Sequence, residues 1–128
     1  MATPVQRDAY KIAHDYIQQA IELIGPGVSY REFASKLPLL PDGYRQQQYA
    51  AVAHGIGTDD EPPFIPFPGG EWKIMPEGEF RENMVVSVEC DAGKVGEQDG
   101  VKLEDEVLIT ANGPVVISLY PYEAKLLE

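Results

Sequence analysis

A change in hydrophobic periodicity near residue 49 limits the possible folds of this chain more than any other feature. Before that point, apolar residues recur at intervals of three and four, which is typical of one face of a helix. The sequence GPG at residues 25–27 is expected to end this helix. After residue 49, apolar residues come in short runs rich in valine and isoleucine, which are typical of strands. The helical stripe consists of Val5, Ala9, Ile12, Ala13, Tyr16, Ile17, Ala20 and Ile24.

Capping signals predict where two helices begin. Thr3 stands three residues before Gln6, so the two side chains are placed to cap the first turn reciprocally. Ser29 stands three residues before Glu32 in the same way and predicts a second, shorter helix. That helix is expected to stop before Pro38, because a proline restricts the backbone of the residue that precedes it.

The second part of the chain predicts a sheet. The run YAAVAHGIG at residues 49–57 is apolar, is bounded by glycine and is expected to form a buried strand. Residues 58–82 are crowded with proline and glycine and are expected to cross the surface as a loop. Helices followed by strands predict an α+β fold: one domain over residues 1–128, with two helices on one face of a mainly antiparallel sheet. The other strands are expected in NMVVSVEC, VKLEDEVLIT and PVVISLY.

The charge balance excludes two classes of partner. The chain has 21 acidic and 10 basic residues and a formal net charge of −11, which repels phosphate backbones and anionic lipid head groups. We therefore expect neither nucleic acid nor membrane among its partners. Cys90 is the only cysteine, which excludes an internal disulfide and a thiolate zinc cluster. The N-terminus is polar and carries no secretory signal, so the expected location is the cytoplasm.

Two glutamates, Glu89 and Glu104, stand inside strands where apolar residues are expected. If these strands pair with the two residues opposite each other, the Cβ atoms lie on one face, roughly 4.5–5.5 Å apart. At this distance two ionised carboxylates repel each other and lose hydration. A cation between them removes both costs. His54 ends a neighbouring strand and could complete a divalent metal site. The alternative is that each glutamate simply faces water.

Three motifs in this order resemble the second half of the pita-bread metalloenzymes, the superfamily of methionine aminopeptidase, aminopeptidase P, prolidase and creatinase. They are HGIG at residues 54–57, MVVSVEC and VKLEDEVLIT. The segment GPGVSYREF also resembles a helix-to-helix turn of that fold, so the similarity runs from about residue 3 to about residue 122. The resemblance implies the C-terminal half of a pita-bread catalytic domain with a curved sheet.

The resemblance also implies a dinuclear metal site. His54 would bind one ion, Glu89 would bind as well, and Glu104 would bridge two ions of manganese, zinc, iron or cobalt. The family's two other ligands are aspartates of the N-terminal half, and no segment of this chain resembles the strands that carry them. Such a half-domain is expected to bind metal weakly by itself, to turn over nothing, and to pair as a homodimer through apolar surface left exposed.

The region after His54 departs from the peptidase pattern. Peptidases of the family usually carry a second histidine seven residues later, to handle the leaving group, and Glu61 stands there instead. HGIGTDDEPP and FRENMVVSVE resemble the branch that contains dimethylsulfoniopropionate-cleaving lyases. That branch implies Asp60 as the catalytic base and Tyr49 as a wall of the substrate pocket. The alternative for Asp60 is a loop acid in water.

Three functions remain open from the sequence. The first is the C-terminal part of a metal-dependent hydrolase that resembles Xaa-Pro peptidases and acts on a peptide or small-molecule substrate. The second is the same half of a carbon–sulfur lyase, which would cleave a sulfonium substrate by proton abstraction. The third is a non-catalytic module that keeps the fold for binding or assembly, because two of the five metal ligands are missing.

Overall fold

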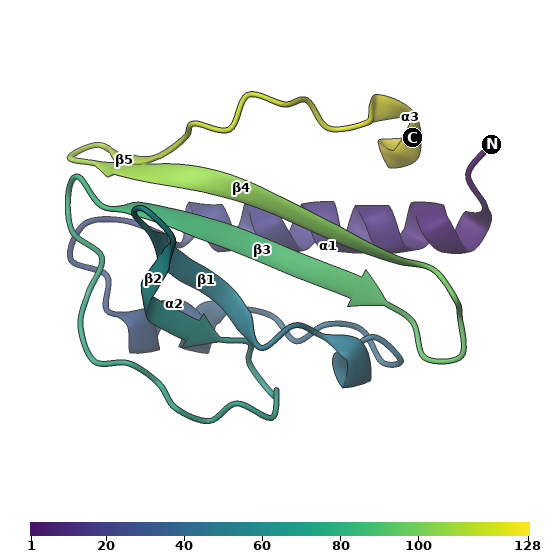
Figure 1. Cartoon of the computed structure of the whole chain (residues 1–128), viewed down its shortest axis with the longest axis horizontal. Helices are drawn as coiled ribbons and strands as arrows, with labels where there is room; N and C mark the ends of the chain where they lie inside the picture. Colours follow the sequence, from purple (N-terminus) through teal and green to yellow (C-terminus); the bar gives the residue numbers. More distant parts are fainter.

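The computed structural model describes residues 1–128. In it, helix α1 (Pro4–Glu22) begins at the residue that the capping signal predicts. The Thr3 hydroxyl accepts a hydrogen bond from the backbone N–H of Gln6, and the Gln6 side chain accepts one from that of Thr3. Helix α1 lies across two long strands, β3 (Val85–Gly93) and β4 (Gly100–Thr110) (Figure 1), and most of its apolar stripe is buried in the core. The first helix is therefore anchored by a reciprocal cap at its start and by the core along its length.

Helix α2 (Tyr30–Lys36) follows the glycine turn. The Ser29 hydroxyl accepts a hydrogen bond from the backbone N–H of Glu32 at its first turn, and the helix ends before Pro38, as predicted. A single 3₁₀ turn, η1 (Arg45–Gln47), then leads into the sheet. None of the helices is long and apolar enough to cross a membrane.

Five antiparallel strands form one open sheet in the order β2 (Asp60–Pro66), β1 (Ala51–Ile56), β3, β4 and β5 (Gly113–Val116). The predicted α+β fold, with helices on one face of an antiparallel sheet, is thus confirmed. β1 and β2 run at a clear angle to β3 and β4, so the sheet is twisted (Figure 1).

The hairpin of β3 and β4 has the predicted register. Glu89 lies opposite Glu104. Because side chains alternate along a strand, Val86 and Val88 point to the α1 side and enter the core. Ser87, which lies between them, and Glu89, which follows Val88, point to the other face. The pairing thus brings two acids together on the face of the sheet that α1 does not cover.

The prediction of a loop over residues 58–82 is wrong for its first part, which forms β2 at one edge of the sheet. Proline is tolerated there because an edge strand leaves one row of backbone groups unpaired. The register passes from Gly55 opposite Glu61 to His54 opposite Phe64, so the intervening Pro62 and Pro63 lie in a bulge without ladder partners.

The last predicted strand is shorter than PVVISLY, because β5 ends at Val116. Beyond it the chain bonds through side chains as well as backbone: Ser118 Oγ donates to the Asp105 carboxylate at 2.6 Å, and the Tyr122 hydroxyl donates to the same group. Asp105 is buried on the α1 side of β4, so it needs these donors. A short third helix that the sequence pattern did not predict, α3 (Ala124–Leu127), then packs against α1.

Candidate metal centre

Three neighbouring strands place His54, Glu89 and Glu104 on one face of the sheet. His54 on β1 lies opposite Ser87 on β3, and Glu89 is two residues further along β3, so the alternation of side chains puts all of them on the same side. His54 and Glu89 are buried, whereas the side chain of Glu104 is 39% exposed. The group therefore opens to solvent on the side of Glu104.

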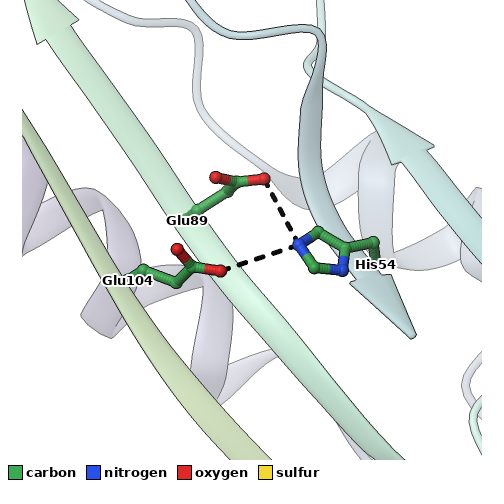
Figure 2. A group of neighbouring side chains, drawn as sticks. All are labelled: His54, Glu89 and Glu104. Carbon is green, nitrogen blue, oxygen red and sulfur yellow. Dashed lines mark ion pairs between the residues drawn. The ribbon is translucent and has the colours of Figure 1, made fainter. Parts of the chain in front are cut away.

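The imidazole of His54 points between the two carboxylates (Figure 2). Its Nε2 atom lies 3.5 Å from Oε1 of Glu89 and 3.6 Å from Oε1 of Glu104. One ligand atom from each of the three side chains lies within 4.8 Å of the others. Metal–ligand bonds of about 2.0–2.2 Å place two ligands of one ion about 3–4 Å apart. The spacing and the donor types fit a divalent ion.

The other ring nitrogen of His54 is held by the backbone. Nδ1 lies 3.0 Å from the carbonyl oxygen of Gly55, so the ring N–H donates there and the lone pair of Nε2 faces the carboxylates. This is the tautomer that a metal-binding histidine needs, because the second nitrogen must donate to a fixed acceptor. Oδ1 of Asp60 lies 3.9 Å from this same nitrogen, Nδ1.

Lys102 lies against the outer side of both carboxylates. Its Nζ atom is 2.6 Å from Oε2 of Glu89 and 3.5 Å from Oε2 of Glu104. Hydrogen bonding to Glu89 is the main cause that raises the pKa of the Lys102 ammonium above its usual value. The ammonium group therefore offsets the repulsion between two acids, while their Oε1 atoms remain turned to the imidazole.

A hydroxyl group fixes the orientation of the third side chain. Ser87, which is fully buried, donates a hydrogen bond from its Oγ to Oε1 of Glu104. Glu104 is otherwise the most exposed member of the group, so this bond restricts the carboxylate to the direction of His54.

The remaining predicted site residues lie at the rim. Tyr49 is half-exposed, and the centre of its ring is 5.0 Å from Nζ of Lys102. Asp60 is exposed and lies beyond Nδ1 of His54, on the opposite side of the ring from the glutamates. Glu61 is exposed on β2, and its carboxylate lies against Gly57. The structure thus gathers His54, Glu89 and Glu104 and leaves Asp60 and Glu61 outside the group.

Lys102 and Ser87 were not anticipated from the sequence, although a signal for each is present. The alternation of a strand places residue 102 on the face of Glu104, and residue 87 on the face of Glu89. A basic or hydroxyl side chain two positions from a buried acid is a natural partner for it. Once the register of the hairpin is known, both follow.

Cys90 is expected to be chemically inert in the folded chain. It is buried on the α1 side of β3, and burial raises the pKa of its thiol to about 12. At pH 8 the thiol stays protonated, so its reaction with Ellman's reagent should be more than about a hundredfold slower than in guanidinium chloride. A stopped-flow absorbance trace measures both rates, and fast labelling of the folded chain would contradict the burial.

Comparisons with known proteins show which proteins the chain resembles. The sequence model described as "Metallopeptidase family M24" matches residues 1–111. The chain is 32% identical over 119 residues to the dimethylsulfoniopropionate lyase DddP of Roseovarius nubinhibens, which covers 93% of this chain and 27% of the lyase. It is 28% identical over 115 residues to the Xaa-Pro dipeptidase of Pyrococcus horikoshii, which covers 84% of this chain and 29% of that protein.

Solved structures show the same architecture. The prolidase of Pyrococcus furiosus superposes with a TM-score of 0.77 and 26% identity, over 95% of this chain and 35% of the prolidase. The Xaa-Pro dipeptidase of Bacillus anthracis, at 24% identity, superposes with a TM-score of 0.75 over 96% of this chain and 33% of its own. The chain therefore spans about a third or less of these relatives, and the predicted pita-bread half is confirmed. Because the family match covers most of its residues, the chain belongs to metallopeptidase family M24.

Proposed function

We propose that this chain is the C-terminal catalytic part of a dinuclear-metal-dependent enzyme and supplies three of its metal ligands. The observation that carries the proposal is the convergence of Nε2 of His54 with Oε1 of Glu89 and Oε1 of Glu104, at 3.5 and 3.6 Å. Lys102 carries one positive charge against the two carboxylates, so a cation between the Oε1 atoms and Nε2 of His54 would compensate the negative charge that remains. Glu104, with one oxygen toward His54 and the other toward solvent and Lys102, is the candidate bridge.

Divalent ions at this position would activate a water molecule and polarise a substrate oxygen. The residues of the chain have separate tasks around them. The carbonyl oxygen of Gly55 holds the tautomer of His54, Ser87 orients Glu104, and Lys102 neutralises the outer carboxylate oxygens. Manganese, zinc, iron and cobalt all accept this mixture of imidazole and carboxylate.

The leading candidate reaction is hydrolysis of an Xaa-Pro peptide. It is supported by the family match and by the similarity to Xaa-Pro dipeptidases in sequence and to prolidase in structure. In this proposal a partner segment, the N-terminal half of the catalytic domain, supplies two aspartate ligands on the open side of Glu104. Without that segment the chain is expected to bind metal weakly and to be inactive. Pairing of two copies as a homodimer is part of the same proposal.

A second candidate, cleavage of a sulfonium substrate at a carbon–sulfur bond, is favoured by two observations. The first is the 32% identity to a dimethylsulfoniopropionate lyase. The second is the residue content of the rim: Asp60 and Tyr49 stand beside the group, and Glu61 occupies the position where peptidases carry a histidine. Asp60 would act as the base in this reaction, and Tyr49 would contact the substrate.

One experiment separates the two reactions. The protein translated from its complete reading frame, loaded with Mn²⁺, is offered an Ala-Pro dipeptide and dimethylsulfoniopropionate in parallel. Release of alanine is the expected result of the leading proposal, and release of dimethyl sulfide supports the second. Asp60→Ala is expected to retain the metal in either case, and should lower turnover at least about tenfold only if Asp60 is the base of the lyase reaction. Turnover of neither substrate by the loaded protein would contradict both reactions.

A further inference from the structure

A cavity of about 540 Å³ lies between η1 with the residues that follow it and the loop after β2. Its walls include Gln48 and Tyr49 on one side, and Gly70 and Trp72 on the other. The volume lies in the range of sites that hold small organic molecules. None of the residues that line it belongs to the metal ligands.

The side chain of Gln48 is the unusual feature of this cavity. Both its amide oxygen and its amide nitrogen are buried and have no hydrogen-bond partner. Such a group destabilises the fold, since water satisfied it in the unfolded chain. The neighbouring backbone leaves room for it: a Cβ atom on Gly70 would lie only 2.8 Å from Nε2 of Gln48. The amide thus fits into the fold, but no hydrogen bond offsets the free-energy cost of its burial.

Two chains of contacts connect the cavity to the metal centre. The Tyr49 ring lies over Nζ of Lys102, 5.0 Å from its centre, and Lys102 contacts both glutamates. On the other side, the Trp72 ring lies 6.2 Å from Phe64, which lies 6.1 Å from the His54 ring. A molecule between Tyr49 and Trp72 would therefore lie next to the neighbours of Lys102 and Phe64, the two residues that flank the candidate metal ligands.

The charges around the cavity favour a neutral ligand. Arg45 lines it, but its Nε donates to the Leu40 carbonyl at 2.6 Å and its Nη1 pairs with Asp42 at 3.1 Å. Glu71 lines the same cavity and would repel an anion. A carboxylate would also offer acceptors only, so the oxygen of Gln48 would remain without a donor.

We infer that this cavity is a substrate subsite for a carboxamide or peptide unit, and that the Gln48 amide, which lies covered against Gly70 without a partner, turns into the cavity and pairs with the ligand by two hydrogen bonds. An amide presents one donor and one acceptor side by side, which is the complement of a glutamine side chain. Tyr49 and Trp72 would cover the apolar part of the same ligand. The inference rests on the proposed function in one respect, that the reacting bond lies at the metal centre. It favours a peptide over a sulfonium compound as the substrate class.

The test uses small neutral probes and the metal-free 128-residue chain, so it does not depend on turnover. Benzamide and methyl benzoate have the same ring and similar shape, but only benzamide carries an N–H donor. In ¹H–¹⁵N spectra, benzamide should shift the Trp72 indole and the Gln48 side-chain amide signals, with an affinity about tenfold higher than methyl benzoate. Equal affinities, or shifts that avoid both signals, would overturn the inference.

Substitution of the glutamine gives a second readout. Gln48→Met keeps the length of the side chain and should remove the tenfold preference for benzamide while raising the midpoint of thermal unfolding, because an unpaired buried amide is lost. Gln47→Met is the matched control: Gln47 is the preceding residue, is exposed and does not line the cavity, so the preference should persist. Loss of the preference in the control, or its persistence in Gln48→Met, would contradict the assignment.

The outcome is distinguishable from that of the proposed function. If benzamide binds as expected but the loaded, complete protein does not cleave Ala-Pro, the subsite stands and the proposed peptidase reaction fails. If Ala-Pro is cleaved but benzamide and methyl benzoate bind alike, the reaction stands and the assignment of the subsite is overturned.

Discussion

Glu104→Ala is expected to reduce the affinity of the chain for Mn²⁺ at least tenfold and to abolish turnover by the complete enzyme. Even the loss of a hydrogen-bonding partner of a metal ligand typically costs about 10–100-fold in affinity, and Glu104 is placed to bind the ion directly. A water molecule could fill the position between Nε2 of His54 and Nζ of Lys102, but it would not supply the negative charge of the carboxylate. Isothermal titration with MnCl₂ measures the affinity of the chain.

A neighbouring acid provides the control for this prediction. Glu106 stands two residues further along β4 on the same face, is exposed and lies opposite Ser87. Glu106→Ala removes the same charge from the same strand and should change the affinity less than about twofold, since an exposed charge is screened. Equal losses in the two variants would show that Mn²⁺ responds to the total charge of the face rather than to a coordinated site.

Gly55→Ala is expected to destabilise the chain by about 3 kcal/mol, at the upper end of what an overpacked site costs. A Cβ atom at this position would lie 2.4 Å from the carbonyl oxygen of Pro62 and 2.9 Å from that of Glu61. Both are backbone atoms of β2, so β1 and β2 would have to separate. Because the carbonyl of Gly55 also holds Nδ1 of His54, metal affinity should fall together with stability. Urea unfolding measures the first effect and titration with MnCl₂ the second.

Gly57→Ala is the corresponding control. A Cβ atom there would also meet a neighbour, at 2.2 Å, but that neighbour is the carboxylate of Glu61, the end of a flexible and exposed side chain. The side chain can rotate away, so the loss of stability should stay below about 1 kcal/mol. A loss in Gly57→Ala as large as that in Gly55→Ala would contradict the importance of the close backbone approach.

The register of the β3–β4 hairpin was predictable because the pattern of these strands leaves few alternatives. In β3, Val86, Val88 and Cys90 enter the core and alternate with Ser87 and Glu89, so a shift by one residue would turn Glu89 into the core beneath α1. The same alternation would survive a shift by two residues, so the direct pairing of Glu89 with Glu104 is an inference that the structure confirms. The convergence of His54 on the same point needed more, namely the pairing of β1 with β3, which two short strands distant in sequence do not reveal by pattern.

β2 and the end of β5 could not be predicted for opposite physical reasons. β2 carries Pro62 and Pro63, which normally exclude a strand, and tolerates them because it lies at an edge and bulges. PVVISLY has strong β propensity, yet the chain leaves the ladder after Val116, because Ser118 and Tyr122 satisfy the buried carboxylate of Asp105. In both places tertiary contacts override the local preference.

The cavity beside Gln48 could not be predicted from the sequence pattern. Gln48 stands in a polar run, RQQQY, where three glutamines look equivalent. Only the backbone that approaches from Gly70 distinguishes it, and that approach joins segments more than twenty residues apart. Local patterns report on which face a side chain lies, but not on which distant loop covers it.

The ammonium group of Lys102 affects how the chain folds in the absence of metal. With the Lys102 ammonium already in contact with Glu89 and Glu104, one of the two negative charges is compensated as soon as the hairpin closes. We therefore expect the chain to fold without metal, in contrast to small zinc modules that stay unfolded until loaded. A chelator that removes any bound metal should consequently leave the midpoint of thermal unfolding of the chain nearly unchanged.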